Sequence, residues 1–342
     1  MSPTPNPPPR GIWTPIPTFF ASKSSPHYDA VTPPFDLDAQ AEHALGLARA
    51  GVVGLVVFGS TGEAVHVHPR DRKVLLRSLR DRLDQAGFSF PRCPLMAGTA
   101  TNSVQETLEQ LEDAQQAGAQ WGLCLVPGYN APVVSQEGIM MWFTAVADAS
   151  PIPILIYHYP GVSNNVQVAP ATFEALARHP NIVGCKLSHG DISKLTQIAL
   201  NPAISHSDFH VFTGLGQQLL PAMTVNCVGA IDGSANFFPK SLVRLYTLCC
   251  QSHLSVEETA ERAQLQYRVS CMEELIVKHG IPGIKEAVSR LRGIGDRDGT
   301  RLPLLGGIPG GDEEWARWLG VLDKVEELEV RLSLAFPEGV EK

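Results

Sequence analysis

The sequence lacks the usual marks of secretion, metal binding and disulfide bonding. Its seven cysteines are an odd number, and no two of them have the C-x-x-C spacing of a zinc site. It contains no N-x-S/T glycosylation acceptor. The proline-rich segment Met1 to Pro9 has no apolar run, and the first twenty residues contain one Arg. We therefore expect reduced thiols, no metal and a cytoplasmic location.

Positive charge and long hydrophobic runs are scarce as well. The 27 Lys and Arg residues against 35 Asp and Glu residues give a net charge of -8, which does not favour binding to nucleic acid or anionic lipid. The uncharged stretch from Val211 to Ile231 is interrupted by Gly, Gln, Asn and Pro, which disfavours a membrane span. We expect neither nucleic acid nor membrane as a partner.

What the sequence does have is enough apolar residues for a large core and a regular alternation of segments. Of the 342 residues, 44% are hydrophobic and 18% are charged. Short apolar runs typical of buried strands alternate with amphipathic helical patterns. The runs are Gly11 to Phe19, Gly54 to Phe58, Pro94 to Gly98, Gly122 to Val126, Ile154 to Tyr157, Ile182 to Lys186, His210 to Thr213 and Gly229 to Asp232.

This alternation predicts an α/β protein, and a closed (β/α)8 TIM barrel fits better than an open doubly wound sheet. Residues 1–10 are predicted to be a disordered proline-rich N-terminus, 11–252 the barrel, and 253–342 a C-terminal helical extension. The predicted helices are Asp38 to Ala50, Arg70 to Gln85, Ser103 to Gly118, Gln136 to Ala149, Pro170 to His179, Asp191 to Ala199, Pro239 to Ser252, Ser255 to His279, Pro282 to Arg292 and Asp312 to Leu334.

Lys186 is the strongest candidate for chemistry, because reactive groups of such barrels lie at the carboxyl ends of the strands. It ends the apolar run 181–186. Burial lowers the pKa of an ammonium group and frees an amine that can attack a carbonyl to form a Schiff base. The alternative is a lysine that extends to solvent from the strand end and has no chemical role.

Two further strand ends carry candidates. Tyr157 ends the preceding strand and is placed to shuttle protons, although a tyrosine on a strand is more often a packing residue. The loop from Gly59 to Gly62 has backbone N–H groups suited to a small carboxylate, but taken alone it is a weak motif.

Two other motifs do not indicate a site. The segment Thr213 to Leu219 lacks the third glycine of a dinucleotide fingerprint, and two histidines, His66 and His68, are too few for a metal site.

Together these motifs resemble the dihydrodipicolinate synthase and N-acetylneuraminate lyase family of pyruvate-dependent class I aldolases. The resemblance covers about residues 11 to 305 and rests on Gly59 to Glu63, on the Tyr-x-x-Pro of Tyr157 to Pro160 and on the Gly-x-Lys of Gly184 to Lys186. It implies that Lys186 forms an imine with pyruvate or another 2-oxo acid while Tyr157 shuttles protons. No cofactor or metal is implied.

The resemblance also assigns supporting residues. Ser60 and Tyr129 match relay positions, and in many members this tyrosine reaches the site across a subunit interface, which implies a homo-oligomer, a dimer or tetramer. The substrate-binding positions that it implies are Ser60, Thr61, Ser188, Gly214 and Ile231.

One departure separates the branches of the family. Val162 stands where synthase members have an arginine that binds the carboxylate of aspartate semialdehyde, and Gly128 replaces a frequent tyrosine. We therefore expect the lyase or 4-hydroxy-2-oxoglutarate aldolase branch, with a 2-oxo-3-deoxy sugar acid or 4-hydroxy-2-oxo acid cleaved to pyruvate and an aldehyde. The alternatives are dihydrodipicolinate synthase, a related dehydratase, or a non-catalytic protein that binds a 2-oxo acid.

Overall fold

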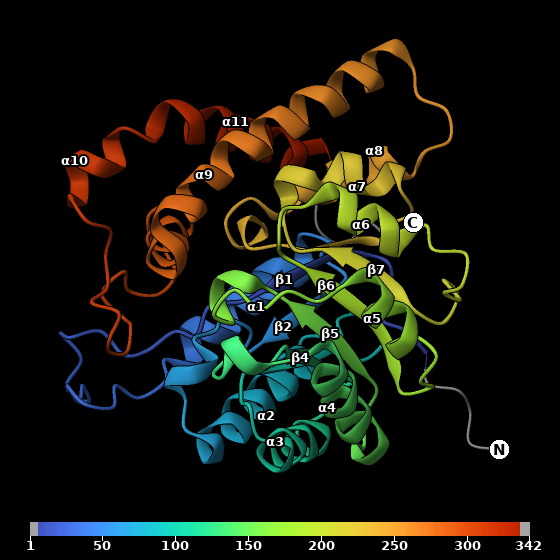
Figure 1. Ribbon diagram of the computed structural model, residues 1–342. Helices are drawn as coiled ribbons and strands as arrows, with labels where there is room; N and C mark the ends of the chain where they lie inside the picture. The colour runs from blue at the N-terminus through green and yellow to red at the C-terminus, as the bar shows by residue number, and fades with distance from the viewer. Residues whose placement is uncertain (1–5, 336–342) are drawn as a thin grey trace.

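Eight parallel strands close into a barrel in the order of the chain (Figure 1). The computed structural model describes residues 6–335. The strands are β1 (Gly11–Pro15), β2 (Gly54–Val57), β3 (Leu95–Thr99), β4 (Trp121–Leu125), β5 (Ile154–His158), β6 (Ile182–Leu187), β7 (His210–Thr213) and β8 (Gly229–Ile231). The predicted (β/α)8 fold with additional C-terminal helices is confirmed.

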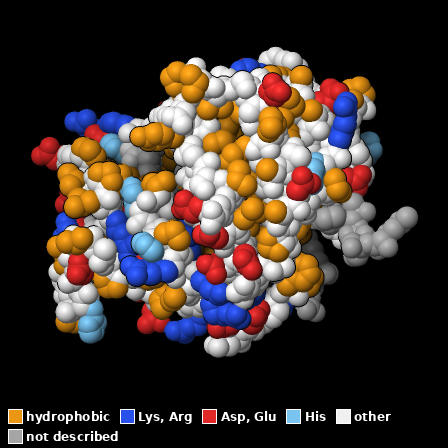
Figure 2. All heavy atoms as spheres, turned by 60° about the horizontal axis from the view of Figure 1, so that its bottom comes forward, with side chains coloured by type: hydrophobic (Ala, Val, Ile, Leu, Met, Phe, Trp, Pro, Cys, Tyr) orange, Lys and Arg blue, Asp and Glu red, His pale blue; other side chains and the backbone are white. Residues whose placement is uncertain are grey.

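Helices surround the barrel and cover its outer face. Several begin at a residue whose side chain caps the first turn, as Ser103 does by accepting a hydrogen bond from Glu106 N at 3.2 Å. The barrel helices are α1 (Leu37–Arg49), α2 (Pro69–Gln85), α3 (Val104–Gln116), α4 (Gln136–Ala149), α5 (Pro170–Leu176), α6 (Ile192–Ala199), α7 (Leu219–Thr224) and α8 (Pro239–Cys250). Within residues 6–335 we find no helix with the length and hydropathy that a bilayer crossing requires. Acidic and basic side chains lie intermixed on the face seen in Figure 2.

Alternation along the strands divides the side chains between the barrel interior and the helical shell. The interior holds a compact set of large residues, namely Trp13, Val56, Met96, Trp121, Leu123, Leu155, Tyr157, Val183, Phe212, Val228 and Ile231. The opposite faces of the same strands join one continuous hydrophobic core beneath the helices. The interior is therefore a packed core, and only its carboxyl end is left for a site.

The amino end of the barrel is closed by the residues that precede β1. The indole N–H groups of Trp121 and Trp13 donate to the carbonyl oxygens of Asn6 and Pro9, each at 3.0 Å. His210 Nδ1 lies 2.8 Å from the carbonyl oxygen of Pro8. The disorder predicted for residues 1–10 therefore does not extend over residues 6–10, and residues 1–5 lie outside the described part of the chain.

The C-terminal extension lies against the carboxyl end of the barrel. Helix α9 (Val256–Arg292) is kinked at Gly280, where φ is 57° and ψ is -137°, and it joins the two helices predicted for this segment. The helix predicted from Asp312 is in fact two, α10 (Gly311–Ala316) and α11 (Leu319–Ala335). Figure 1 shows α9 and α11 side by side above the barrel.

Candidate active site

The predicted nucleophile lies inside the barrel, on β6. Lys186 is paired in register with Tyr157 of β5 and is only 4% exposed. Its Nζ lies 4.4 Å from the centroid of the Tyr157 ring. The amine and the phenol are thus brought together, as their positions at adjacent strand ends predicted.

The environment of Lys186 favours a neutral amine. Burial lowers the pKa of Lys186 to about 8, and the carboxylate of Asp232 opposes that fall. At neutral pH an appreciable part of the protein therefore carries a nucleophilic amine at this position, on the order of a tenth. This shift disfavours the alternative of a lysine that merely extends to solvent.

A hydroxyl pair lies beside the amine. The Tyr157 phenol oxygen and Ser60 Oγ are 2.9 Å apart, in a contact where either group can donate. Burial raises the pKa of Tyr157 to about 12, against the effect of hydrogen bonds from Ser60 and Ser188. The phenol therefore stays protonated at neutral pH. Two linked hydroxyls can take up a proton at one end and release one at the other.

The loop after β2 offers donors to an anion. Among the described residues, the backbone N–H groups of Ser60 and Thr61 have no hydrogen-bond acceptor. A Cβ at Gly62 would lie 2.9 Å from the nitrogen of Phe58, so the tight fold of the loop requires glycine at this position. Phe58 and Glu63 have φ values of 59° and 52°, which frame the turn. The backbone of this loop is suited to a small carboxylate.

Glycine at position 214 makes room for the nucleophile. A Cβ at Gly214 would lie 1.9 Å from Ser188 Oγ and 3.0 Å from Lys186 Cε. Ser188 is 8% exposed, and Ile231, the last residue of β8, is fully buried beside Trp13 of β1. Of the predicted positions, Gly214 and Ser188 thus lie close to each other, and Gly214 lies close to the outer part of the lysine side chain.

We expect Gly214→Ala to reduce kcat/KM by about 10- to 100-fold, because the added methyl overpacks Ser188 and displaces the lysine. Gly214 has no left-handed backbone conformation, so the loss should come from space alone. The double variant Gly214→Ala/Ser188→Ala relieves the closest contact and should recover part of the activity. Steady-state kinetics of both variants test this, and an unimpaired single variant would contradict it.

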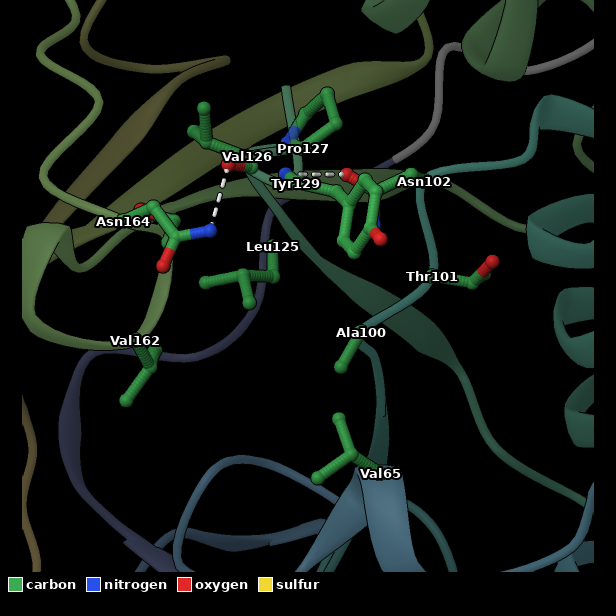
Figure 3. A pocket seen from close by; sticks show the side chains of 12 residues that line it. Val65, Ala100, Thr101, Asn102, Leu125, Val126, Pro127, Tyr129, Val162 and Asn164 are labelled. Atoms are coloured by element: carbon green, nitrogen blue, oxygen red, sulfur yellow. Dashed lines mark hydrogen bonds between the residues drawn. The ribbon is translucent and has the colours of Figure 1, made fainter. Parts of the chain in front are cut away.

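Tyr129 does not join this group within one chain. Its side chain is 80% exposed, and its backbone N–H donates to Asn102 Oδ1 at 3.0 Å. Figure 3 shows Tyr129 beside Asn102 in a hollow lined also by Val162 and Asn164. The relay role implied for Tyr129 therefore stays a prediction.

Glu63 is a buried anion whose partners the sequence did not reveal. Its carboxylate forms an ion pair with Lys285 of α9, and Oε2 lies 3.1 Å from His66 Nδ1. Lys285 also donates to the carbonyl of Gly299 at 2.7 Å and is 1% exposed. Burial raises the pKa of Glu63, but its contacts with His66 and Lys285 outweigh burial and hold that pKa below its ordinary value. The pair ties the loop after β2 to the C-terminal extension.

A second buried acidic pair lies near the lysine. The backbone N–H of Gly216 donates to Asp232 Oδ2 at 2.7 Å and to Glu273 Oε1 at 3.0 Å. Burial raises the pKa of Glu273 well above its ordinary value, and the Asp232 carboxylate raises it further. Asp232 is also the carboxylate that opposes the fall in the pKa of Lys186.

The rate of imine formation should rise with pH, with a midpoint near the pKa of about 8 for Lys186. Asp232→Asn removes the charge that holds this pKa up, so the midpoint should move to lower pH. The matched control is Asp323→Asn, an exposed residue of α11. Borohydride trapping with pyruvate from pH 6 to 10 measures the midpoint. An unchanged or higher midpoint in Asp232→Asn contradicts this account.

A buried lysine with a lowered pKa, at the strand end of a closed (β/α)8 barrel and beside a phenol, defines a site of the Schiff-base aldolase kind. The model of the dihydrodipicolinate synthetase family matches residues 35–307. The chain belongs to this family.

Relatives agree with this membership over most of the chain. A probable 4-hydroxy-2-oxoglutarate aldolase of Emericella nidulans is 34% identical, covering 84% of this chain and 87% of its own. An L-threo-3-deoxy-hexylosonate aldolase of Hypocrea jecorina is 35% identical, with 84% and 88% covered. The crystal structure of a dihydrodipicolinate synthase family protein from Coccidioides immitis has a TM-score of 0.79 at 28% identity, covering 96% of this chain and 99% of that one. The predicted lyase branch is confirmed.

The predicted cytoplasmic location is wrong by this comparison, since the Emericella nidulans relative is named a mitochondrial protein. The compartment of a protein is set by a short terminal address that receptors read. The prediction rested on the cysteine pattern, the lack of a glycosylation acceptor and the single Arg in the first twenty residues, and none of these features excludes a mitochondrial location.

Proposed function

We propose that this protein is a class I aldolase that cleaves or forms a 4-hydroxy-2-oxo acid or 2-oxo-3-deoxy sugar acid, with pyruvate as one partner. The observation that carries the proposal is the buried amine of Lys186, with a pKa lowered to about 8, against the Tyr157–Ser60 hydroxyl pair. The aldolase names of the relatives support the same carbon–carbon lyase chemistry.

In the cleavage direction the amine of Lys186 attacks the C2 ketone, and loss of water leaves a protonated imine. The C3–C4 bond then breaks, its electron pair moves toward the imine nitrogen, and the C4 hydroxyl gives its proton to the Tyr157–Ser60 pair. The aldehyde leaves, and the enamine takes a proton at C3. Water hydrolyses the resulting imine to release pyruvate and restore the amine. Imine chemistry alone supplies the electron sink.

The remaining predicted residues take supporting roles in this proposal. The N–H groups of Ser60 and Thr61 hold the carboxylate of the 2-oxo acid, and Ser188 contacts the substrate. The exposed Tyr129 is the relay residue that a second copy of the chain supplies, in a homo-oligomer. Val162 offers no positive charge, which disfavours the synthase reaction with aspartate semialdehyde.

Borohydride reduction in the presence of pyruvate tests this proposal directly. We expect one covalent adduct, on Lys186, together with pyruvate release from hydroxy-2-oxo acids. Binding of pyruvate with no adduct and no turnover would favour the non-catalytic binding protein. Turnover of aspartate semialdehyde in preference to hydroxy-2-oxo acids would favour the synthase.

A further inference from the structure

Next to the Tyr157–Ser60 pair lies a hollow of about 230 Å³ whose walls are mostly apolar. A cavity of roughly 150 Å³ is enough to admit benzene, so this hollow has room for a substantial substituent. Nine apolar residues line it, and six of them form what we name the apolar collar: Val65, Ala100, Leu125, Val162, Ile281 and Leu304.

The collar is built by several elements at once. Leu125 is the last residue of β4, and Ala100 follows β3 directly. Val65 and Val162 lie in short turns of 3-10 helix after β2 and β5. Figure 3 shows these four side chains around one open space, which continues into the outer hollow beside Tyr129. The hollow reaches Ser60 and Tyr157, and the Tyr157 ring contacts Lys186, so a C4 substituent of a substrate bound to Lys186 would extend toward this ring of side chains.

The collar offers no partner to a carboxylate. Among the described residues that line the hollow there is no lysine or arginine, and the one anionic side chain is Glu63. The two nearby cations already have partners. Lys285 is paired with Glu63, and the Arg301 guanidinium donates to the carbonyl oxygens of Pro33 and His66 at 2.8 and 3.1 Å. A buried carboxylate here would lack a counter-charge and would lie near a negative one.

A chain of several hydroxyls would also be poorly matched. The hydroxyls of Ser60 and Tyr157 bond to each other, and His66 Nδ1 is used on Glu63. In the outer hollow the Asn164 amide donates to the carbonyl of Gly128 at 3.0 Å. A polyol pressed against the collar would give up hydrogen bonds to water and regain few, which disfavours its binding.

We propose that the preferred substrate is a 4-hydroxy-2-oxo acid whose C4 substituent is an uncharged hydrocarbon group, alkyl or aryl, so that cleavage releases a hydrocarbon aldehyde. This inference rests on the proposed class I aldolase activity and specifies its acceptor side. The hydrocarbon group lies within the apolar collar, and the C4 hydroxyl faces the Tyr157–Ser60 pair.

The test compares four aldehydes in the addition direction with pyruvate: butanal, benzaldehyde, glyceraldehyde and glyoxylate. We expect kcat/KM for the better hydrocarbon aldehyde to exceed that for glyceraldehyde and for glyoxylate by at least about tenfold. A faster reaction with glyoxylate or glyceraldehyde overturns the inference.

A charge introduced into the collar should invert this preference. Val162 is 45% exposed, so Val162→Arg is compatible with folding. We expect it to raise the ratio of kcat/KM for glyoxylate over butanal by at least about tenfold, because an arginine can bind a carboxylate with two hydrogen bonds. Val162→Met, long but uncharged, is the matched control and should leave the ratio unchanged. An equal shift of this ratio in both variants, or no shift in Val162→Arg, would contradict the role of the collar in selecting the aldehyde.

Borohydride trapping with pyruvate alone distinguishes a failure of the substrate inference from a failure of the proposed aldolase function. A trapped imine without consumption of either hydrocarbon aldehyde overturns the substrate inference and leaves the aldolase mechanism standing. Failure to trap any imine overturns the proposed function, and the collar inference falls with it.

Discussion

Lys186→Ala is expected to lower kcat by at least about 1,000-fold and to abolish borohydride trapping with pyruvate. The variant removes the amine that forms the imine in the proposed reaction, and without an imine the electron pair of the C3–C4 bond has no acceptor. Folding should be retained, since the buried Lys186 side chain contacts the Tyr157 ring and has no ion-pair partner among the described residues.

Two variants control this experiment. Lys186→Arg keeps the positive charge but has no neutral amine near pH 8, and should be as inactive as Lys186→Ala. Lys73→Ala removes an exposed lysine of α2 that pairs with Asp113, and should leave trapping and turnover intact. Turnover by Lys186→Ala at more than a few per cent of the natural rate would contradict imine catalysis at this position.

Lys285→Met is expected to destabilise the protein by about 3–5 kcal/mol, because it leaves the Glu63 carboxylate buried without its counter-ion. Both side chains are at most 1% exposed, so water cannot replace the lost partner. The reaction should suffer as well. Glu63 follows the loop that offers the Ser60 and Thr61 N–H groups, and a displaced loop should raise the KM for the 2-oxo acid.

Chemical denaturation of three variants separates charge from packing. Glu63→Gln/Lys285→Met removes both charges together and should be more stable than Lys285→Met alone. Arg178→Met breaks an exposed ion pair with Glu174 on α5 and should change stability by less than about 1 kcal/mol. If Lys285→Met proves no less stable than Arg178→Met, the buried Glu63–Lys285 pair does not stabilise the contact between the loop after β2 and the C-terminal extension.

The sequence pattern predicts the barrel well because strand and helix periods are local properties. The bounds of Gln136–Ala149 and His210–Thr213 are as predicted. The first strand was predicted to reach Phe19 but ends at Pro15, where Pro15 and Pro17 lack the N–H groups that a strand ladder uses. The break near Gly280 was predicted, and the non-helical φ and ψ of this residue divide α9 into two helical parts.

The site was only partly predictable, for a physical reason. Lys186, Tyr157 and Ser60 lie at strand ends, and parallel strands bring their ends together. The partners of Glu63 and Asp232 lie on α9, 222 and 41 residues away, where nothing local marks the contact. Lys285 shares a helical face with the apolar Val288, which is the one signal that it was not a surface lysine.

Helix α9 makes the site in the barrel depend on a helix that lies outside the barrel. A (β/α)8 sheet closes its own hydrogen-bonding cycle, yet here one outside helix supplies the counter-ion of Glu63, the neighbour of Asp232 and, through Ile281, part of the collar. Sequence changes in α9 could therefore alter the activity and the substrate preference, while the strands that hold the reactive groups stay unaltered.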